Sequence, residues 1–285
     1  MLIDSHIHLS HRGYDGSFSA IGLHDLIPSV RREDLLQLFQ DNGIVGFVEP
    51  GIDLESNFKL LELANRYPDC IFPAVGIHPT RVAATPFRAH KVLRNLSKLP
   101  QVVAIGELGL DFHHPRKEQH RLRQYLWFLW QLRLAHKRKL PLVLHIRMAD
   151  RETIFLLRRF RKRIHGGVCH CFKGNDTTAR IYTEELGLML GIGGTLLQQS
   201  RYLSDLEEAV RVTPLESILL ETDGPYVAPT KPEGITKSQW QKAKNTSLIL
   251  PCLVQRIAEL KGIPAATVER ITTENALRLF GITSI

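Results

Sequence analysis

The sequence predicts an α/β fold, a single-domain (β/α)8 TIM-type barrel that spans residues 1–285. Two observations predict it: eight short apolar segments recur along the chain, and amphipathic segments of helical length separate most of them. Parallel strands need long crossover connections, so this alternation indicates a parallel sheet. Eight such units in 285 residues fit the usual length of a barrel of this kind.

The predicted strands are brief and apolar on both faces, as expected of strands that are buried on both sides. They begin at Leu2, Ile44, Phe72, Val102, Pro141, Gly166, Gly187 and Ile218. The predicted helices cover residues 31–42, 54–67, 87–99, 116–139, 150–164, 176–186 and 202–212. An open doubly wound sheet is the structural alternative, but no Gly-x-Gly-x-x-Gly turn follows the first strand.

The composition is that of an ordinary globular protein, with 44% hydrophobic and 23% charged residues, which excludes a disordered or collagen-like chain. Four cysteines do not make a disulfide framework in a chain of this length, so we expect a reducing compartment. The first residues lack the features of a signal peptide, and the apolar residues 126–130 are too few to span a bilayer. We therefore expect a cytoplasmic protein with no membrane contact and no obligatory protein partner. A net charge of +8 permits binding to nucleic acid without indicating it.

The first strand ends in a His-x-His pair that could hold a metal ion. Alternation along a strand places His6 and His8 on one face, with Asp4 below them. Two neutral imidazoles at a fixed separation can bind a divalent cation. Most His-x-His matches are ordinary core or surface histidines, so the pair alone is weak evidence.

Four further strand ends carry residues of the metal-ligand type: Glu107, His145, His170 and Asp223. For each of them separately, a satisfied core or capping role is at least as common as metal binding. Together with the His-x-His pair they occupy five of the eight predicted strands, and strands of a barrel end at its catalytic face. The set therefore predicts a bound divalent metal.

Several cationic or polar residues near these strand ends are candidates for substrate contact. His78 could contact a phosphate or only pack in its loop, and Arg147 could clamp a phosphate or form a structural ion pair. Asn245 is a further candidate for substrate contact. Upper-loop cations that could steer a phosphate backbone are Arg12, Arg81, Lys173, Lys231 and Lys244.

Two carboxylates could support the metal ligands rather than bind metal themselves. Asp111 shares its strand face with Glu107, and Glu221 shares its face with Asp223. Each could orient a ligand through a hydrogen bond. Each could equally serve as an internal hydrogen-bond partner of the core.

Other conspicuous motifs have plainer explanations. In Cys169-His170-Cys171, alternation directs both cysteines to the face opposite His170, which argues against a zinc knuckle. The basic residues 158–163 end the fifth predicted helix, away from the catalytic face, where cations complement the helix dipole. Trp127 and Trp130 lie on an apolar helix and are expected to be core residues rather than base-stacking platforms.

Six motifs follow one another along the chain: Asp4-Ser5-His6-Ile7-His8-Leu9, Gly76-Ile77-His78-Pro79, Gly106-Glu107-Leu108-Gly109-Leu110-Asp111, Leu140-Pro141-Leu142-Val143-Leu144-His145, His170-Cys171-Phe172 and Leu220-Glu221-Thr222-Asp223-Gly224-Pro225-Tyr226. In this order they resemble the TatD-type metal-dependent deoxyribonucleases of the amidohydrolase superfamily. Residues 272–280 also resemble the closing helix of that family. One such motif would be weak evidence, whereas all of them in order are specific.

The resemblance implies a TIM-type barrel with two divalent metal ions, and the donor types suit Zn, Mn or Mg. One metal would be held by His6, His8, Glu107 and Asp223, and the other by Glu107, His145 and His170. Glu107 would thus bridge the two metals, and Asp223 would orient and deprotonate the attacking water. The implied activity is a deoxyribonuclease that hydrolyses phosphodiesters, acting as an exonuclease on single-stranded DNA.

The chain departs from the family pattern at places that bear on its substrate. It reads Lys244-Asn245-Thr246-Ser247 where many relatives carry Arg-Asn-x-Pro, and the loop over residues 10–28 is longer than typical. Two other functions stay open. One is a metal-dependent hydrolase of esters, amides or lactones, and the other is a non-catalytic barrel that binds nucleic acid or a partner protein.

Overall fold

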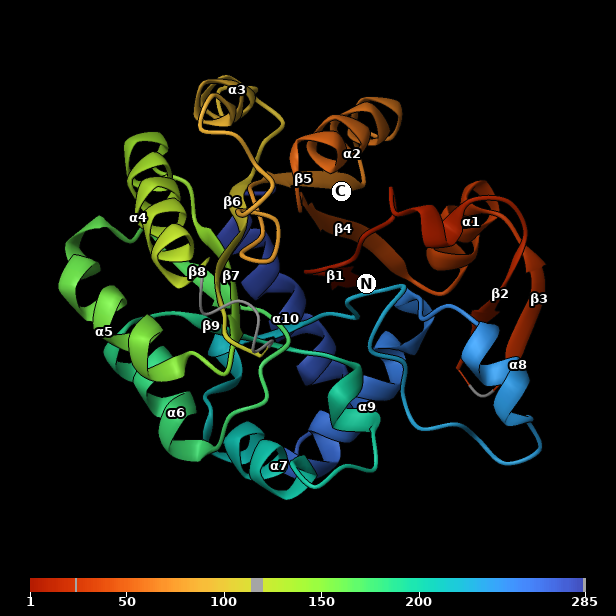
Figure 1. The fold of residues 1–285 in the computed structure, drawn as a ribbon. Helices are drawn as coiled ribbons and strands as arrows, with labels where there is room; N and C mark the ends of the chain where they lie inside the picture. Colours follow the sequence, from red (N-terminus) through yellow and green to blue (C-terminus); the bar gives the residue numbers. More distant parts are fainter. Residues whose placement is uncertain (24, 114–119, 284–285) are drawn as a thin grey trace.

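Eight parallel strands follow one another around a barrel in the order in which they occur in the chain (Figure 1). The structure is a computed structural model that describes residues 1–23, 25–113 and 120–283. The strands are β1 (Leu2–Asp4), β4 (Ile44–Pro50), β5 (Ile71–Val75), β6 (Ala104–Asp111), β7 (Leu142–Arg147), β8 (Gly167–Cys169), β9 (Met189–Ile192) and β10 (Ile218–Leu220). The Ser5 N–H donates to the Leu220 carbonyl oxygen at 2.9 Å and so joins the last strand to the first. The predicted barrel is confirmed, since a doubly wound sheet would reverse its strand order.

The predicted elements agree with the observed ones closely. Each strand begins within two residues of its predicted start. The predicted helices correspond to α1 (Arg32–Asp41), α2 (Leu54–Arg66), α3 (Ala89–Leu96), α4 (Arg121–Arg138), α5 (Asp150–Phe160), α6 (Asp176–Arg180) and α7 (Leu203–Val212). Short turns extend two of them: η3 (Arg161–Arg163) follows α5 and η4 (Ile181–Glu185) follows α6. Residues 116–119 of the fourth predicted helix lie outside the described residues.

Local signals explain where these helices begin and end. At the start of α2, the Asp53 carboxylate accepts from Ser56 N at 2.9 Å, and Ser56 Oγ accepts from Asp53 N at 2.8 Å. This reciprocal pair satisfies two backbone donors that the first turn of a helix leaves free. At the end of α4, Lys139 takes a left-handed conformation with φ of 56°, which stops the helix before β7.

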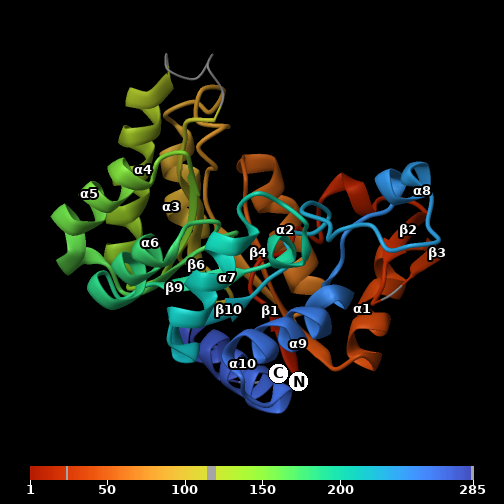
Figure 2. The same ribbon diagram turned by 90° about the horizontal axis from the view of Figure 1, so that it is seen from below.

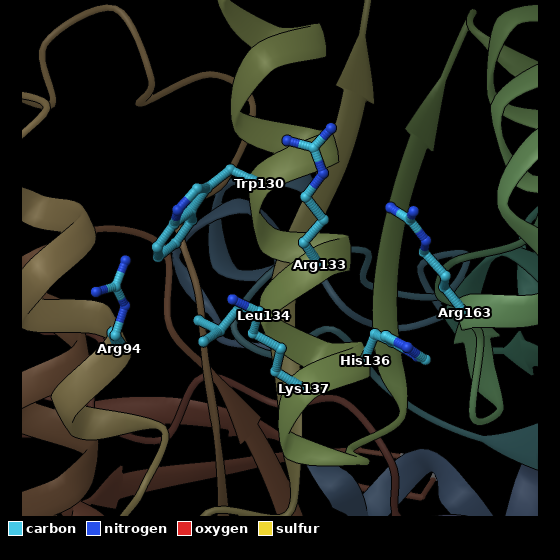
Figure 3. A pocket seen from close by; sticks show the side chains of 7 residues that line it. All are labelled: Arg94, Trp130, Arg133, Leu134, His136, Lys137 and Arg163. Carbon is cyan, nitrogen blue, oxygen red and sulfur yellow. The ribbon is translucent and has the colours of Figure 1, made fainter.

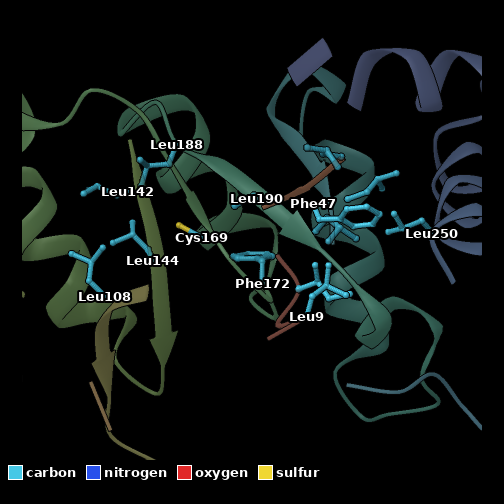
Figure 4. Packing of buried hydrophobic residues seen from close by; sticks show 14 of the residues in the cluster. Leu9, Phe47, Leu108, Leu142, Leu144, Cys169, Phe172, Leu188, Leu190 and Leu250 are labelled. Carbon is cyan, nitrogen blue, oxygen red and sulfur yellow. The ribbon is translucent and has the colours of Figure 1, made fainter. Parts of the chain in front are cut away.

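Two clusters of buried apolar side chains hold the barrel together. Inside it, Ile3, Val48 and Leu219 pack in one cluster with Phe280 of α10 (Ala265–Phe280), which closes the end at which the strands begin. Between the sheet and the outer helices lies a larger cluster, part of which Figure 4 shows around Leu144. Trp127 is 1% exposed within that cluster, as predicted.

The segment that the sequence analysis treated as a long loop contains regular structure. After η1 (Arg12–Tyr14), the strands β2 (Phe18–Ile21) and β3 (Leu26–Val30) form an antiparallel hairpin. The prediction of a loop was wrong because Pro28 and the left-handed Ser29, with φ of 58°, interrupt the pattern of a strand. The hairpin lies beside α8 (Lys237–Lys242) in both views (Figures 1 and 2), and Lys244 N donates to Ser19 O at 2.8 Å.

The chain after β10 completes the outer layer. It contains α8, the turn η7 (Ser247–Ile249), α9 (Leu250–Lys261) and α10, while η5 (Gly194–Leu197) and η6 (Leu215–Ser217) precede β10. The start of the chain lies against α10, where Thr273 Oγ1 donates to Met1 O at 2.6 Å. Among the described residues, no helix is both long and apolar enough to cross a membrane.

Candidate metal centre

His6 and His8 lie just beyond the first strand rather than on it. β1 ends at Asp4, so strand alternation, on which the prediction relied, does not position these two histidines. Backbone pairing positions them instead, since Asp223 N donates to His6 O at 2.8 Å and His8 N donates to Gly224 O at 2.8 Å. Both rings are buried, and their Nε2 atoms lie 3.3 Å apart. The pair predicted to bind metal therefore converges through the loop that follows β1.

Glu107 points into the barrel because the pairing of β6 with β7 is irregular. Ala104 belongs to the cluster inside the barrel, so strict alternation would direct Glu107 outward, toward the helices. The register shifts between Ile105 and Leu108, and Leu108 joins the outer cluster. Glu107 consequently turns inward, with its side chain 4% exposed.

Four metal-type donor atoms gather at this end of the barrel. His6 Nε2 lies 3.6 Å from Glu107 Oε2 and 3.7 Å from Asp223 Oδ1. His8 Nε2 lies 3.9 Å and 3.5 Å from the same two oxygens. A tetrahedral metal with bonds of about 2.0–2.2 Å separates its ligand atoms by roughly 3.3–3.6 Å. The donor types match the first predicted ligand set. The donor atoms of His6, His8 and Glu107 lie within 4.8 Å of one another, and Asp223 forms such a group with His6 and His170.

A second group of donors surrounds the other oxygen of Glu107. Oε1 lies 2.9 Å from His145 Nδ1 and 2.9 Å from His170 Nε2, and these two nitrogens are 3.2 Å apart. His78 Nε2 approaches the same oxygen at 3.3 Å. The structure therefore brings together the second predicted ligand set and adds His78, which the sequence analysis assigned to substrate contact.

The two carboxylates of the centre are held in their charged form. Burial raises the pKa of Glu107, but the imidazoles of His78 and His170 and a hydrogen bond from His145 outweigh it and hold the pKa well below its ordinary value. Burial likewise raises the pKa of Asp223, and the hydrogen bond with His8 and the nearby imidazoles lower it below its ordinary value. Both groups are therefore anions that can bind a cation without first losing a proton.

The histidines fall into two electrostatic groups. Burial, together with His170, lowers the pKa of His6 well below its ordinary value, and burial lowers that of His78 to about 4 although Glu107 opposes it. Burial also acts on His170, but Glu107 and Glu221 outweigh it and raise its pKa. His6 and His78 are thus neutral imidazoles with nitrogen lone pairs, which is the form that binds metal.

Two further carboxylates lie behind the histidines of the second group. Asp111 Oδ2 is 3.4 Å from His145 Nε2, and Glu221 Oε1 is 3.7 Å from His170 Nδ1. In each ring the other nitrogen faces Glu107. A carboxylate behind an imidazole fixes the orientation of the ring and makes the opposite nitrogen a better donor. This geometry supports the orienting role considered for Asp111 and Glu221.

Comparison with known proteins decides the family of this barrel. Residues 3–281 match the family model described as TatD related DNase. The chain belongs to the TatD family. It is therefore a metal-dependent hydrolase that acts on ester bonds, as the resemblance of its motifs implied.

Individual relatives agree with this assignment along nearly the whole chain. A protein of Cronobacter sakazakii named "3'-5' ssDNA/RNA exonuclease TatD" is 34% identical, with 87% of this chain and 91% of the relative covered. A Mycobacterium tuberculosis protein named as an uncharacterized metal-dependent hydrolase TatD is 32% identical, with 99% and 98% covered. The crystal structure of a TatD homologue from Escherichia coli K12 is similar with a TM-score of 0.83 at 26% identity, covering 99% of this chain and 98% of that one.

The remaining candidates for substrate contact in this TatD protein differ in their surroundings. Arg147, at the end of β7, and Lys173, just after β8, are both exposed. Asn245 is fully buried, and its amide nitrogen donates to Thr222 O at 2.8 Å and to Tyr226 O at 2.7 Å. Asn245 therefore shapes the loop after β10 and does not reach a substrate, which corrects the expectation for this residue.

The Cys-His-Cys segment and the basic residues 158–163 lie away from the metal-type donors, apart from His170 itself. Cys169 is buried in the outer cluster, on the side away from His170. Cys171 takes a left-handed conformation with φ of 48°, and its N–H donates to the Glu221 carboxylate at 2.5 Å. Residues 158–163 form the end of α5 and η3, as predicted, and Arg158 pairs there with Glu185 at 2.6 Å.

Three features near the TatD centre were not predicted from the sequence. Glu49, at the end of β4, is buried and accepts from Ser10 N at 2.7 Å, which ties the first loop to the centre. The sequence did offer a signal for Glu49: an acidic residue at the end of an apolar strand is costly to bury unless it has a partner. Tyr226 Oη lies 3.0 Å from His11 Nε2 at the exposed rim.

The third of these features is a network around Asp4. Its carboxylate accepts from His6 N at 3.2 Å and from Thr222 N at 3.1 Å. It also accepts from Thr222 Oγ1 at 2.6 Å and from Ser247 Oγ at 2.7 Å. Asp4 therefore links β1 to the segments that follow β10, directly behind the metal-type donors.

Proposed function

We propose that this chain is an exonuclease that hydrolyses phosphodiester bonds in single-stranded DNA with the help of two divalent metal ions. One observation carries the proposal: the two oxygens of Glu107 face two different sets of donors, at 3.6–3.9 Å on one side and 2.9–3.3 Å on the other. A single buried carboxylate with donors on both sides suits two cations that share it. Relatives that are named 3'-5' ssDNA/RNA exonucleases support nucleic acid as the substrate.

The residues fit the metals in type and number. His6, His8, Glu107 and Asp223 would hold one ion, and Glu107, His145 and His170 the other, with His78 within reach of the second. Two such ions acidify a water molecule and neutralise charge on the phosphate oxygens. Mixed imidazole and carboxylate donors suit Zn, Mn or Mg, so the identity of the metal is left to measurement.

Asp223 is the group we assign to accept a proton from the attacking water. Its low pKa keeps it ionised, and its side chain is 15% exposed, the most accessible carboxylate among the proposed ligands. Its Oδ1 lies 3.5 Å from His8 Nε2 and 3.7 Å from His6 Nε2. Its placement after β10, beside the donors of the first set, lets it orient a water molecule toward the centre.

Substrate phosphates would be held by cations at the open end of the barrel. Arg147 ends β7, two residues after His145, and Lys173 lies three residues after His170; both side chains are exposed. Arg147 can bind two phosphate oxygens at once, whereas Lys173 acts as a point charge. Their removal is expected to raise KM more than it lowers kcat, because they bind parts of the substrate that do not react.

The experiment is degradation of end-labelled single-stranded DNA by metal-loaded protein, with Asp223→Asn beside the wild type. Loss of a general base costs at least about 100-fold in rate, so the ladder of shortened products should nearly vanish in the variant. Asp205→Asn, an exposed change in the first turn of α7, serves as the matched control and should retain full activity. Labels at the 3′ and 5′ ends report the polarity.

Two outcomes would overturn the proposal. Metal-loaded protein that leaves DNA intact but hydrolyses esters, amides or lactones would assign the centre to a different substrate class. Purified protein that binds no metal and cleaves nothing would indicate a non-catalytic barrel. Equal cleavage by Asp223→Asn and wild type would refute the role assigned to Asp223.

A further inference from the structure

The positive charge of this protein is concentrated on three consecutive outer segments of the barrel. Residues 88–98, 121–139 and 158–163, which contain α3, α4 and η3, hold 15 of the 37 lysines and arginines and none of the 29 aspartates and glutamates. The rest of the chain therefore has more acidic than basic residues. The net charge of +8 is a property of one side of the molecule rather than of its whole surface.

A cavity of about 360 Å³ lies on this side, over the outer face of α4. Figure 3 shows Arg94 of α3 on one flank of α4 and Arg163 of η3 on the other, with Arg133 and Lys137 of α4 between them. These four side chains are exposed, and no ion pair joins any of them to a carboxylate of the described residues. Four like charges around one cavity repel one another unless anions enter it.

Trp130 supplies an aromatic surface in the same cavity. The indole is partly buried and stacks on the ring of His90, with centroids 4.1 Å apart and planes at 22°. His90 also packs on Trp127 at 4.2 Å, which anchors the stack to the core. A firmly held aromatic ring beside cations is the arrangement on which proteins stack the bases of single strands.

The helix dipole accounts for only part of this charge, because Arg94 and Lys137 lie in the last turns of α3 and α4 but Arg133 does not. It explains Arg158, which lies in the last turn of α5 and pairs with Glu185. Arg133 lies more than one turn before the end of α4, and its exposed guanidinium belongs to the cavity. The dipole acts only within the last turn, so the charge of Arg133 requires another explanation.

We propose that this cavity binds a segment of single-stranded nucleic acid outside the catalytic centre. Arg94, Arg133, Lys137 and Arg163 contact backbone phosphates, and a base stacks against Trp130. That the bound polyanion is a nucleic acid rests on the proposed function, whereas the inference that the cavity binds a polyanion does not. With a rise of 1.5 Å per residue, Trp130 lies about 14 Å along α4 from Arg121, which is near the catalytic end. A dinucleotide in the centre is too short to reach the cavity.

Binding without turnover tests the site directly. The anisotropy of a labelled oligothymidylate of about 30 nucleotides is measured in EDTA, which removes divalent metal and prevents cleavage. Arg133→Ala/Lys137→Ala should weaken binding about tenfold. The slope of log affinity against log salt should fall by about 1.4, since each phosphate contact on a single strand contributes about 0.7.

A matched variant separates the site from net charge. Arg180→Ala/Arg270→Ala removes the same number of charges from exposed helix positions that pair with Glu184 and Glu274. It should bind within twofold of wild type. Equal weakening by both double variants, or by neither, would overturn the proposal.

Two further measurements identify the ligand. Trp130→Leu should weaken binding of the oligonucleotide but not of inorganic polyphosphate, because only the former has bases to stack. Equal binding of both polymers, unaffected by Trp130→Leu, would refute a nucleic-acid site in favour of a general polyphosphate site. A photoreactive thymidine in the oligonucleotide should crosslink to α4, and crosslinks confined to the loops after β7 and β10 would contradict the proposal.

Kinetics distinguish this inference from the proposed function. In metal-loaded protein, the cavity variant should raise KM for the long oligonucleotide severalfold and leave kcat unchanged. Its kcat/KM for a dinucleotide should equal that of wild type. Protein that binds the oligonucleotide through the cavity but cleaves neither substrate would refute the nuclease function and leave the binding site standing.

Discussion

Substitution of Asp4 tests the link that closes the barrel. Asp4→Ala removes four hydrogen bonds at once: two from backbone N–H groups and two from the hydroxyls of Thr222 and Ser247. A hydrogen bond contributes about 1 kcal/mol net to folding, so we expect a loss of roughly 4 kcal/mol in the free energy of unfolding. At about 2 °C per kcal/mol for a large domain, Tm should fall by roughly 8 °C.

The measurement is thermal unfolding in EDTA, so that lost metal binding does not contribute to the difference. Asp69→Ala serves as the control, because Asp69 is exposed and lies in a turn. Asp4→Asn should lose about half as much as Asp4→Ala, since the hydroxyls of Thr222 and Ser247 can rotate to accept from the new amide. A loss in Asp4→Ala no larger than in Asp69→Ala would refute the role of Asp4 in joining the two ends of the sheet.

Three other changes have defined outcomes. Glu107→Gln should reduce bound metal, measured by elemental analysis, from the proposed two ions per chain to one or none, because a neutral amide cannot neutralise charge in both donor sets. Two ions retained in the variant would contradict the shared carboxylate. Gly109→Ala should abolish metal binding, since a Cβ there would lie 1.8 Å from His145 O and the backbone φ is 151°; Gly234→Ala, also left-handed but in open space, is the control. Burial and Asp69 raise the pKa of Cys70 to about 11, so this thiol is protonated at neutral pH and its alkylation by iodoacetamide should accelerate about tenfold for each pH unit from 7 to 10. Rapid alkylation at pH 7, measured by peptide mass spectrometry, would argue against that pKa.

The fold could be predicted because buried parallel strands have a simple hydrophobic pattern in the sequence. Each of the eight strands begins as a short apolar stretch, and helical segments separate most of them. The hairpin of β2 and β3 has no such hydrophobic pattern. Its second strand contains Pro28 and Ser29, residues that a hydrophobic pattern does not recognise as strand.

The candidate site was predictable in composition but not in geometry. Ligand types at the strand ends can be read from the sequence, because strands of a barrel end on one face. The inward direction of Glu107 could not be read, since it depends on the irregular register between β6 and β7. The position of His78 beside Glu107 could not be predicted either, because it depends on which strand ends are neighbours in the barrel. Local sequence patterns do not show this.

Contacts between distant parts of the chain were beyond local reasoning altogether. Asp4 meets residues that are 218 and 243 positions away, and no periodicity links them. Asn245 was predicted to contact the substrate, whereas its side-chain amide donates to backbone carbonyl oxygens of Thr222 and Tyr226. Buried side-chain amides are usually hydrogen-bonded within the protein in this way.

The same link has a consequence for how the protein is made. The chain is synthesised from its N-terminal side, so His6 and His8 leave the ribosome well before the residues that they contact. Asp223, which lies beside His6, comes more than 200 residues later, and Ser247, which donates to Asp4, comes later still. A nascent chain stopped before Ser247 lacks the contact that holds its first strand to its last. The hydrolytic centre therefore cannot assemble until Ser247 has been synthesised, and products truncated before that residue should carry no nuclease activity.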